Sequence, residues 1–271
     1  MAPTATTALT YLVTGASSGI GLELVRQLSS RGNRVFATVR SRVGTASGRD
    51  ELSSVAEACE GADGGGGTVT VIEGVDISKD GVIDRLRSCE ELRGGTIDVL
   101  VLNAGGVNAI SGAKGMESLG GQSLAGVDSA TMMDTYNLNC VGSLRVYRAL
   151  APQMRSPGGK VCIISTGMGS IGDNGSGGLY AYRCSKAAVN MMAKGMSVDL
   201  RDAGIAVVAA NPGMVVTNFV KPELAEKMGG MSATVSCAGL IKIFDDLNIE
   251  NTGKFMGVSR NKSPQEYAGG W

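Results

Sequence analysis

Residues 11–28 read YLVTGASSGIGLELVRQL, and this stretch decides the fold class. An apolar run ends at Thr14, three glycines follow, and apolar residues then recur at helical spacing. Glycines between a strand and a helix let the backbone approach a phosphate closely, and the helix N-terminus adds positive potential. Glycines also serve turns that bind nothing, so the flanking strand and helix carry the prediction of a pyrophosphate-binding turn. Its expected contacts are Gly15, Ser17, Ser18, Gly19, Ile20 and Gly21.

Short β-rich segments alternate with helical segments along the rest of the chain. They are residues 34–39, 69–73, 98–103, 160–165, 206–211 and, more weakly, 254–258. Most are apolar throughout, which is typical of strands covered by helices on both faces. We therefore predict an α/β protein with a Rossmann-type, doubly wound parallel sheet of about seven strands flanked by helices. Residues 1–271 are expected to form a single domain.

The composition argues against several classes of partner. Lys+Arg and Asp+Glu both total 25, so the zero net charge favours neither a nucleic acid nor an anionic membrane surface. No apolar run approaches the ~20 residues that span a bilayer. Six cysteines lie far apart without a Cys-x-x-Cys motif, which predicts neither a disulfide framework nor a metal site. We expect a cytoplasmic protein that acts on a small molecule.

Two glycine-rich stretches interrupt the alternation of strands and helices. Residues 61–67 end in four consecutive glycines and are expected to form a surface loop. Residues 105–127 follow the fourth strand, whose carboxyl end should border a ligand crevice. This second stretch is therefore either a rim of the active site or a spacer.

One pair of side chains indicates the chemistry. The sequence contains no histidine, so a proton transfer must use a phenol, an amine or a carboxyl group. Tyr182 and Lys186 are one helical turn apart and share a face, where an ammonium group is expected to lower the pKa of the phenol. Tyr180 has no lysine four residues on, and Arg183 should project elsewhere. The alternative interpretation is a packing tyrosine beside a solvated lysine.

Arg40, just after the second strand, bears on the choice of cofactor. A carboxylate near this point would bind the adenosine ribose hydroxyls, but Thr38 and Val39 cannot. The guanidinium of Arg40 would instead pair with a 2′-phosphate. This arrangement favours NADP(H) over NAD(H), with a solvated surface arginine as the alternative.

The motifs together resemble those of the short-chain dehydrogenases/reductases over nearly the whole chain. The resemblance is carried by the glycine turn at residues 14–21, Asp76-Ile77, Asn103-Ala-Gly105, Asn139, Tyr182 with Lys186, and Pro212-Gly213 followed by Thr217. Gly169-Ser-Ile-Gly, the run from Gly178 to Lys186 and an ending in Trp271 are similar to the Sniffer and C-factor branch of carbonyl reductases.

The resemblance implies a role for each matching residue. Besides the glycine turn and Arg40, the residues it assigns to the cofactor are Asp76, Ile77, Asn103, Ala104, Gly105, Tyr182, Lys186, Pro212, Gly213, Val215 and Thr217. The implied catalytic residues are Asn139, Thr166, Tyr182 and Lys186. Asn139 would anchor a water that links Lys186 to solvent.

Position 166 departs from the family pattern. The family usually carries Ser-Ser-x-x-Gly after the fifth strand, whereas this chain reads Ser165-Thr166-Gly-Met-Gly169. A threonine hydroxyl still donates a hydrogen bond to a substrate oxygen, although the β-branch restricts χ1. Ser165 is the alternative, but alternation along the strand should aim it at the opposite face.

The expected function is that of an NADPH-dependent oxidoreductase that reduces a small or medium ketone or aldehyde to an alcohol. Tyr182 would donate the proton, Thr166 would fix the carbonyl oxygen and Lys186 would hold the ribose. Residues 214–231 would select the substrate. In an alcohol dehydrogenase, the alternative enzyme, the same groups would catalyse the reverse reaction. A further alternative, based on the threonine at position 166, is a non-catalytic NADP(H)-binding regulatory or interaction protein.

The helix that carries Tyr182 has two apolar faces. Ala188, Met191 and Val198 lie on one of them, and Val189 and Met196 lie on the other. One face should pack on the sheet. The second would be covered either by another subunit, in a homodimer or homotetramer, or by more of the same chain.

Overall fold

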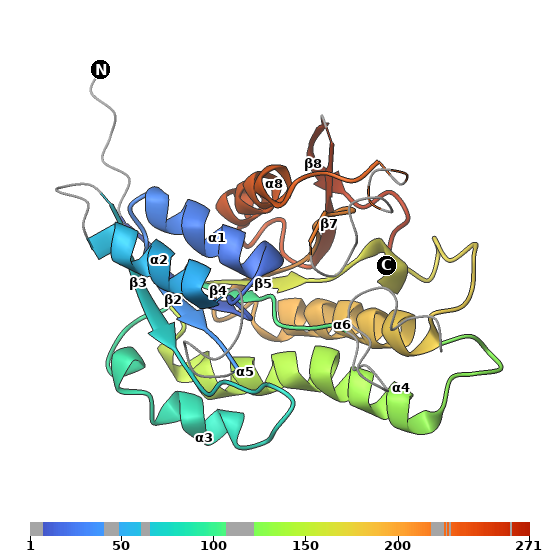
Figure 1. Ribbon diagram of the computed structural model, residues 1–271, viewed down its shortest axis with the longest axis horizontal. Coiled ribbons are helices and arrows are strands. Elements are labelled where there is room, and N and C mark those ends of the chain that lie inside the picture. Colours follow the sequence, from blue (N-terminus) through green and yellow to red (C-terminus); the bar gives the residue numbers. More distant parts are fainter. Residues whose placement is uncertain are drawn as a thin grey trace.

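The computed structural model describes residues 8–40, 49–60, 66–106, 122–217, 225, 227, 229–260 and 262–271. An eight-stranded sheet in the order β3-β2-β1-β4-β5-β6-β7-β8 forms its centre (Figure 1). Its strands are β1 (Thr10–Thr14), β2 (Arg34–Thr38), β3 (Thr68–Ile72), β4 (Val99–Leu102), β5 (Lys160–Ile164), β6 (Ala206–Asn211), β7 (Lys254–Ser259) and β8 (Lys262–Glu266). All paired strands run parallel except β7 and β8. The predicted doubly wound parallel sheet is therefore confirmed.

Helices cover both faces of this sheet (Figure 1). The first face carries α1 (Gly19–Ser30), α2 (Arg49–Glu60) and α8 (Ala233–Asp246). The second carries α3 (Val82–Arg87), α5 (Gly142–Leu150) and α6 (Tyr180–Asp199). A π-helical turn, η4 (Asn137–Val141), joins α4 (Ser129–Tyr136) to α5, and the short 3₁₀ turns are η1 (Glu90–Leu92), η5 (Ala151–Gln153) and η6 (Gly167–Gly169).

Alternation along each strand divides the core into two apolar layers. Tyr11 and Val13 of β1 pack with α1 and α8, whereas Leu12 between them packs with α5 and α6. Successive side chains of a strand point to opposite faces, so a strand covered on both sides must be apolar at every position. This explains why the predicted strands lack polar alternation.

The eighth strand is the element that the sequence pattern missed. The prediction was about seven strands, but β8 pairs antiparallel with β7 at the edge of the sheet. Its sequence, KSPQE, is almost entirely polar and mostly exposed. A proline is tolerated on an edge strand, and one solvated face removes the apolar signal on which the prediction depended.

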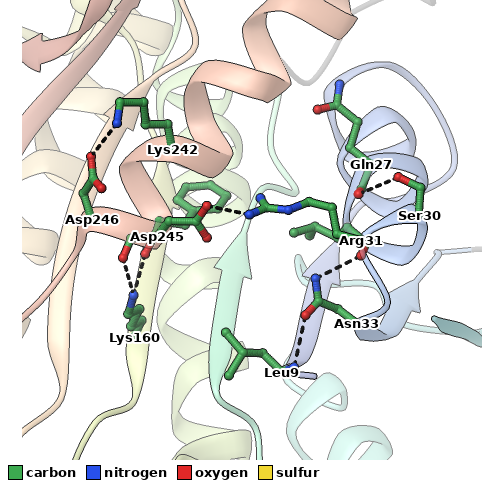
Figure 2. A network of polar contacts seen from close by, with 11 residues as sticks. Leu9, Gln27, Ser30, Arg31, Asn33, Lys160, Lys242, Asp245 and Asp246 are labelled. Atoms are coloured by element: carbon green, nitrogen blue, oxygen red, sulfur yellow. Dashed lines mark hydrogen bonds and ion pairs between the residues drawn. The ribbon is translucent and has the colours of Figure 1, made fainter. Parts of the chain in front are cut away.

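Polar contacts close the amino end of the sheet (Figure 2). The side chain of Lys160 donates to the main-chain oxygens of Phe244 and Asp245 at 2.7 and 2.9 Å, at the end of α8. Arg31, after α1, donates to the Asp245 carboxylate at 2.8 Å. These contacts join α1 and α8 to β5 at the amino end of the sheet. The carboxyl end, on the opposite side, carries the site.

Three predicted loop segments fall largely outside the described residues. They are most of the glycine-rich stretch 61–67, most of the stretch 105–127, and the centre of the proposed substrate segment 214–231. The ends of the last segment pair with each other, because Val215 and Met231 form a parallel bridge.

Candidate active site

A cavity of about 430 Å³ lies at the carboxyl ends of β1, β4, β5 and β6. This volume falls in the range of about 300–1,000 Å³ that is common for small-molecule sites. The predicted residues that line it are Gly15, Ser17, Ser18, Gly19, Ile20, Gly21, Arg40, Asp76, Ile77, Asn103, Ala104, Gly105, Thr166, Tyr182, Lys186, Pro212, Gly213, Val215 and Thr217. Asn139 is the only predicted residue that does not line the cavity.

Five further lining residues were not singled out from the sequence. They are Val75, Gly106, Leu138, Ile164 and Met168. All are apolar or lack a side chain, so no chemical signal distinguishes them from core residues. Only their positions at strand ends or beside motif residues would have indicated them.

The cavity opens where the order of the strands reverses, between β1 and β4. The Thr14 hydroxyl accepts hydrogen bonds from the main-chain nitrogens of Asn103 and Ala104, both at 3.0 Å. In return, the Asn103 amide donates to the oxygens of Thr14 and Gly15 at 2.9 and 3.2 Å. The Asn103 side chain therefore fixes the glycine turn, and the switch point leaves the crevice where open parallel sheets bind ligands.

The glycine turn packs too closely for side chains at two positions. A Cβ at Gly15 would lie 2.9 Å from the Cα of Ala104, and a Cβ at Gly21 would overlap the main-chain oxygen of Gly15. The cap residue of α1, Ser18, makes no side-chain hydrogen bond to the first turn. The N-terminus of α1 thus presents main-chain donors at the cavity wall, which suits an anion.

Charged groups flank the far end of the cavity. Burial raises the pKa of Asp76, but hydrogen bonds from Ser78 and the charges of Arg40 and Lys79 outweigh it and hold that pKa below its usual value. Ser78 donates from both its main chain and its hydroxyl to Oδ1 of Asp76, at 3.0 and 2.7 Å. Asp76 is therefore ionised, and Arg40 is the cation that the cavity exposes at this end.

Tyr182 and Lys186 are both buried in the wall formed by α6. Burial raises the pKa of Tyr182 to about 12 and lowers the pKa of Lys186 to about 8. The ammonium nitrogen lies 6.0 Å from the centre of the phenol ring and donates to the Ile164 oxygen at 3.1 Å. The expectation that Lys186 lowers the pKa of the phenol is wrong for this structure, because burial is what shifts that pKa, and it raises it.

The two hydroxyls after β5 differ in their surroundings. Ser165 also lines the cavity, but it is buried, and its hydroxyl donates to Oδ1 of Asn190 at 2.5 Å. Thr166 is partly exposed at the cavity, and its oxygen accepts from the Met168 nitrogen at 3.3 Å. An oxygen that accepts one bond still has its own proton to donate. Thr166 is therefore the hydroxyl available to a ligand.

Asn139 lies behind the cavity wall, and its expected role of anchoring a water beside Lys186 stays a prediction. Its amide oxygen accepts from the nitrogen of Gly106 at 2.8 Å, and its amide nitrogen donates to Gly106 and Ser185 at 2.8 and 2.9 Å. The side chain is only 1% exposed. These bonds join the segment after β4 to α6, so the Asn139 side chain supports the wall.

Gln122 has a structural role that the sequence did not reveal. Its main-chain and side-chain oxygens accept from the nitrogens of Tyr180 and Tyr182 at 3.2 and 2.9 Å. Leu179, before the first residue of α6, has a left-handed φ of 52° and provides no side-chain cap. Gln122 therefore caps α6 from a distant segment, and a contact so remote in sequence leaves no local signal.

Comparisons with known proteins agree with this architecture. The family described as short chain dehydrogenase matches residues 9–248. The 1-hydroxy-2-glutathionyl-2-methyl-3-butene dehydrogenase of Rhodococcus sp. (strain AD45) is 32% identical over 248 residues, covering 91% of this chain and 95% of that protein. The C-signal protein of Myxococcus xanthus is 37% identical over 175 residues, covering 63% of this chain and 93% of that protein.

Solved structures are similar over almost the whole chain. The NADPH-bound carbonyl reductase from chicken fatty liver superposes with a TM-score of 0.75 at 25% identity, and the match covers 92% of this chain and 96% of that one. The carbonyl reductase Sniffer of D. melanogaster gives 0.73 at 26% identity, with the same coverage. Within the described residues, no helix combines the length and apolar character needed to span a membrane.

Proposed function

This chain belongs to the short-chain dehydrogenase family, as its motifs predicted, and from that premise we propose that it is an NADPH-dependent carbonyl reductase. The family makes it an oxidoreductase. The finer proposal is that its substrate is a small or medium ketone or aldehyde, which it converts to the alcohol. The observation that carries this proposal is one cavity wall on which Thr166, Tyr182 and Lys186 occur together, beside a glycine turn at a helix N-terminus.

The described residues fit a dinucleotide. The overlap that side chains at Gly15 and Gly21 would cause keeps the turn compact, and the uncapped N-terminus of α1 offers main-chain donors to a pyrophosphate. Arg40 would pair with a 2′-phosphate and the segment from Pro212 to Thr217 would border the nicotinamide. The nicotinamide would supply the hydride.

The protein groups would handle the carbonyl oxygen and its proton. Thr166 would donate a hydrogen bond to that oxygen, because a hydroxyl that accepts from the Met168 nitrogen keeps its own proton to donate. Tyr182 would donate the proton. A pKa raised to about 12 keeps the phenol neutral at physiological pH, which suits an acid in the reducing direction. Lys186 would supply positive charge beside both groups.

The test is oxidation of NADPH by the purified protein with a panel of ketones and aldehydes. Tyr182→Phe should lower kcat by about 10²–10⁴-fold, because it removes the general acid and leaves the ring in place. Arg40→Ala should raise KM for NADPH about tenfold and leave that for NADH almost unchanged, since the charge-assisted bond to a phosphate is lost. Arg93→Ala, at an exposed ion pair with Glu90, is the matched control. NADPH binding without turnover of any carbonyl would instead favour the regulatory alternative.

We also propose that the protein self-associates, as a homodimer or homotetramer. Met191 and Val198 on α6 are 72% and 65% exposed, and Met133 on the adjoining α4 is 65% exposed. Large apolar side chains exposed on neighbouring helices are typical of an interaction surface.

A further inference from the structure

The loop after β5 bears Thr166 and reaches the cavity through Met168. On one side this loop is fixed to α6. The Asn190 amide donates to the Gly169 oxygen at 3.3 Å, and a Cβ at Gly169 would lie 2.8 Å from the carbonyl carbon of Lys186. The position of Thr166 therefore depends on what holds the other side of the loop.

Residues 267–271, far from this loop in the sequence, hold the side of the loop that faces away from α6. The buried hydroxyl of Ser170 donates to the main-chain oxygen of Gly269 at 2.9 Å. The nitrogen of Ile171 donates to the oxygen of Trp271 at 3.0 Å. Two neighbouring residues of the loop are thus bonded to the same distant segment.

Tyr267 adds a side-chain tie to the same loop. Its hydroxyl donates to Oδ2 of Asp173 at 2.7 Å. Burial, followed by the hydrogen bond and charge of Asp173, raises the pKa of Tyr267 to about 12, so the phenol remains a donor at neutral pH. A Cβ at Gly167 would overlap the Tyr267 hydroxyl, which shows that the ring lies directly against the residue after Thr166.

The segment is itself anchored on the sheet. The rings of Tyr267 and Trp271 pack on Phe255 of β7, with centroids 4.8 and 5.7 Å away. The nitrogen of Tyr267 also donates to the Phe255 oxygen at 2.7 Å. A segment fixed to the sheet and bonded to the loop transmits the rigidity of the sheet to the loop.

We propose that residues 267–271 form a clamp that positions Thr166 for the carbonyl oxygen, with Tyr267 and Ser170 as positioning residues. This inference rests on the proposed reductase function. Thr166 accepts a bond from Met168 within the clamped loop, so a shift of the loop displaces the hydroxyl from the reacting carbonyl. The proposed cofactor contacts all lie outside residues 165–173, so the clamp governs kcat and not the affinity for NADPH.

The first test is a double-mutant cycle on the Tyr267–Asp173 bond. Tyr267→Phe and Asp173→Ala should each lower kcat about tenfold at saturating NADPH, because small displacements of a reacting group are costly. KM for NADPH should change less than about twofold, since no cofactor contact is lost. The double variant should be no slower than either single one, because both break the same bond. Asp173→Asn keeps an acceptor and should retain activity, and Tyr147→Phe on α5 is the matched control.

A second measurement separates this inference from the proposed function. Hydrogen–deuterium exchange over residues 165–173 should rise in Tyr267→Phe and stay at the wild-type level in Tyr147→Phe. Increased exchange in a protein that reduces no carbonyl would leave the clamp standing and overturn the reductase. Unchanged exchange, or a wild-type kcat in Tyr267→Phe, would overturn the clamp.

Discussion

Thr166 occupies the position at which the family usually has a serine, and its environment explains how the exchange is accommodated. The residue has extended backbone angles, with φ of −160° and ψ of 152°, and its hydroxyl caps the short turn η6. The neighbouring Ser165 hydroxyl is committed to Asn190. The catalytic hydroxyl of this chain is therefore expected to be the threonine.

Substitutions at these two positions test that assignment. Thr166→Ala should lower kcat/KM for a carbonyl substrate about 10²-fold, since removing one donor to a developing oxyanion has effects of that order. Thr166→Ser keeps the donor and should stay within about threefold of the wild type. Ser165→Ala is the control and should have the smaller effect of the two alanine variants in steady-state kinetics. A larger loss in Ser165→Ala would transfer the role to Ser165.

Lys186 illustrates a conflict between stability and activity. Its pKa falls from 10.5 to about 8 on burial, so the unfolded chain binds more protons than the folded one between these values. The penalty for the buried charge is complete below pH 8 and decreases as the pH rises toward 10.5. Lys186→Met should therefore be inactive and more stable than the wild type at pH 7, by several degrees in Tm.

The pH dependence of the stability difference between Lys186→Met and the wild type tests the lowered pKa of Lys186. In urea unfolding, the difference in stability between Lys186→Met and the wild type should be largest below pH 8 and should shrink toward pH 10.5. Comparing the two proteins cancels the contributions of the buried tyrosines and of the buried cysteines other than Cys140, whose charge interacts with that of Lys186. A difference that did not vary with pH would mean that Lys186 titrates normally in the folded protein.

The sequence predicted side chains whose chemistry depends on near neighbours along the chain. It did not predict the partners of side chains that act through contacts with distant segments. Tyr182 and Lys186 are four residues apart on one helix, so they share a face whatever the rest of the fold does. The motif also identifies Asn139, but it gives no indication that Gly106 and Ser185 share hydrogen bonds with its amide group. Sequence motifs identify a residue, but its partners depend on packing between remote segments.

The amino end of α6 shows how one element depends on another. Because Leu179 offers no cap, the nitrogens of Tyr180 and Tyr182 rely on Gln122. Gln122 is 1% exposed and immediately follows residues 107–121. Gln122 thus joins its own segment, before α4, to the helix that carries the proposed proton donor.

Replacing Gln122 measures the importance of this cap. Gln122→Met preserves the volume and removes the acceptor, so it should destabilise the protein by about 1 kcal/mol, as loss of a helix cap does. It should also lower kcat, because the main chain of Tyr182 loses a partner. Gln122→Glu retains an acceptor at the positive end of the helix and should be closer to the wild type. Equal stability of Gln122→Met and the wild type in denaturant titration would exclude the capping role.

Among the elements, the buried strands were predicted to within about one residue at most ends, and the exposed edge was not. Apolar runs such as residues 206–211 coincide with β6, because a strand covered on both faces allows little other composition. The strand β8 pairs through its main chain while its side chains face solvent, so its sequence carries almost no signal. Burial requires apolar residues along a strand and so makes the strand recognisable in the sequence. An exposed edge strand such as β8 has no such requirement.

Across the whole molecule, stability and chemistry occupy opposite ends of the sheet. The amino end is joined by Lys160, Arg31 and Asp245 (Figure 2). The carboxyl end carries the cavity. A parallel sheet directs every strand's carboxyl end to the same edge, so motifs scattered over 200 residues converge there. The alternation of strands and helices predicted that convergence without any knowledge of the contacts.

The surface of α4 and α6 leads to a prediction about assembly. These helices lie side by side on one face of the sheet (Figure 1), and Met191 and Val198 remain largely exposed there. Burying such side chains against a second copy stabilises an assembly by roughly 25 cal/mol for each Å² of apolar surface.

Light scattering should therefore give at least twice the monomer mass for the wild type. Met191→Lys combined with Val198→Lys should give the monomer, because two charges would have to be desolvated at the interface. Val235→Lys, an exposed site on α8 across the sheet, should leave the mass unchanged, and a monomeric wild type would refute the proposed association.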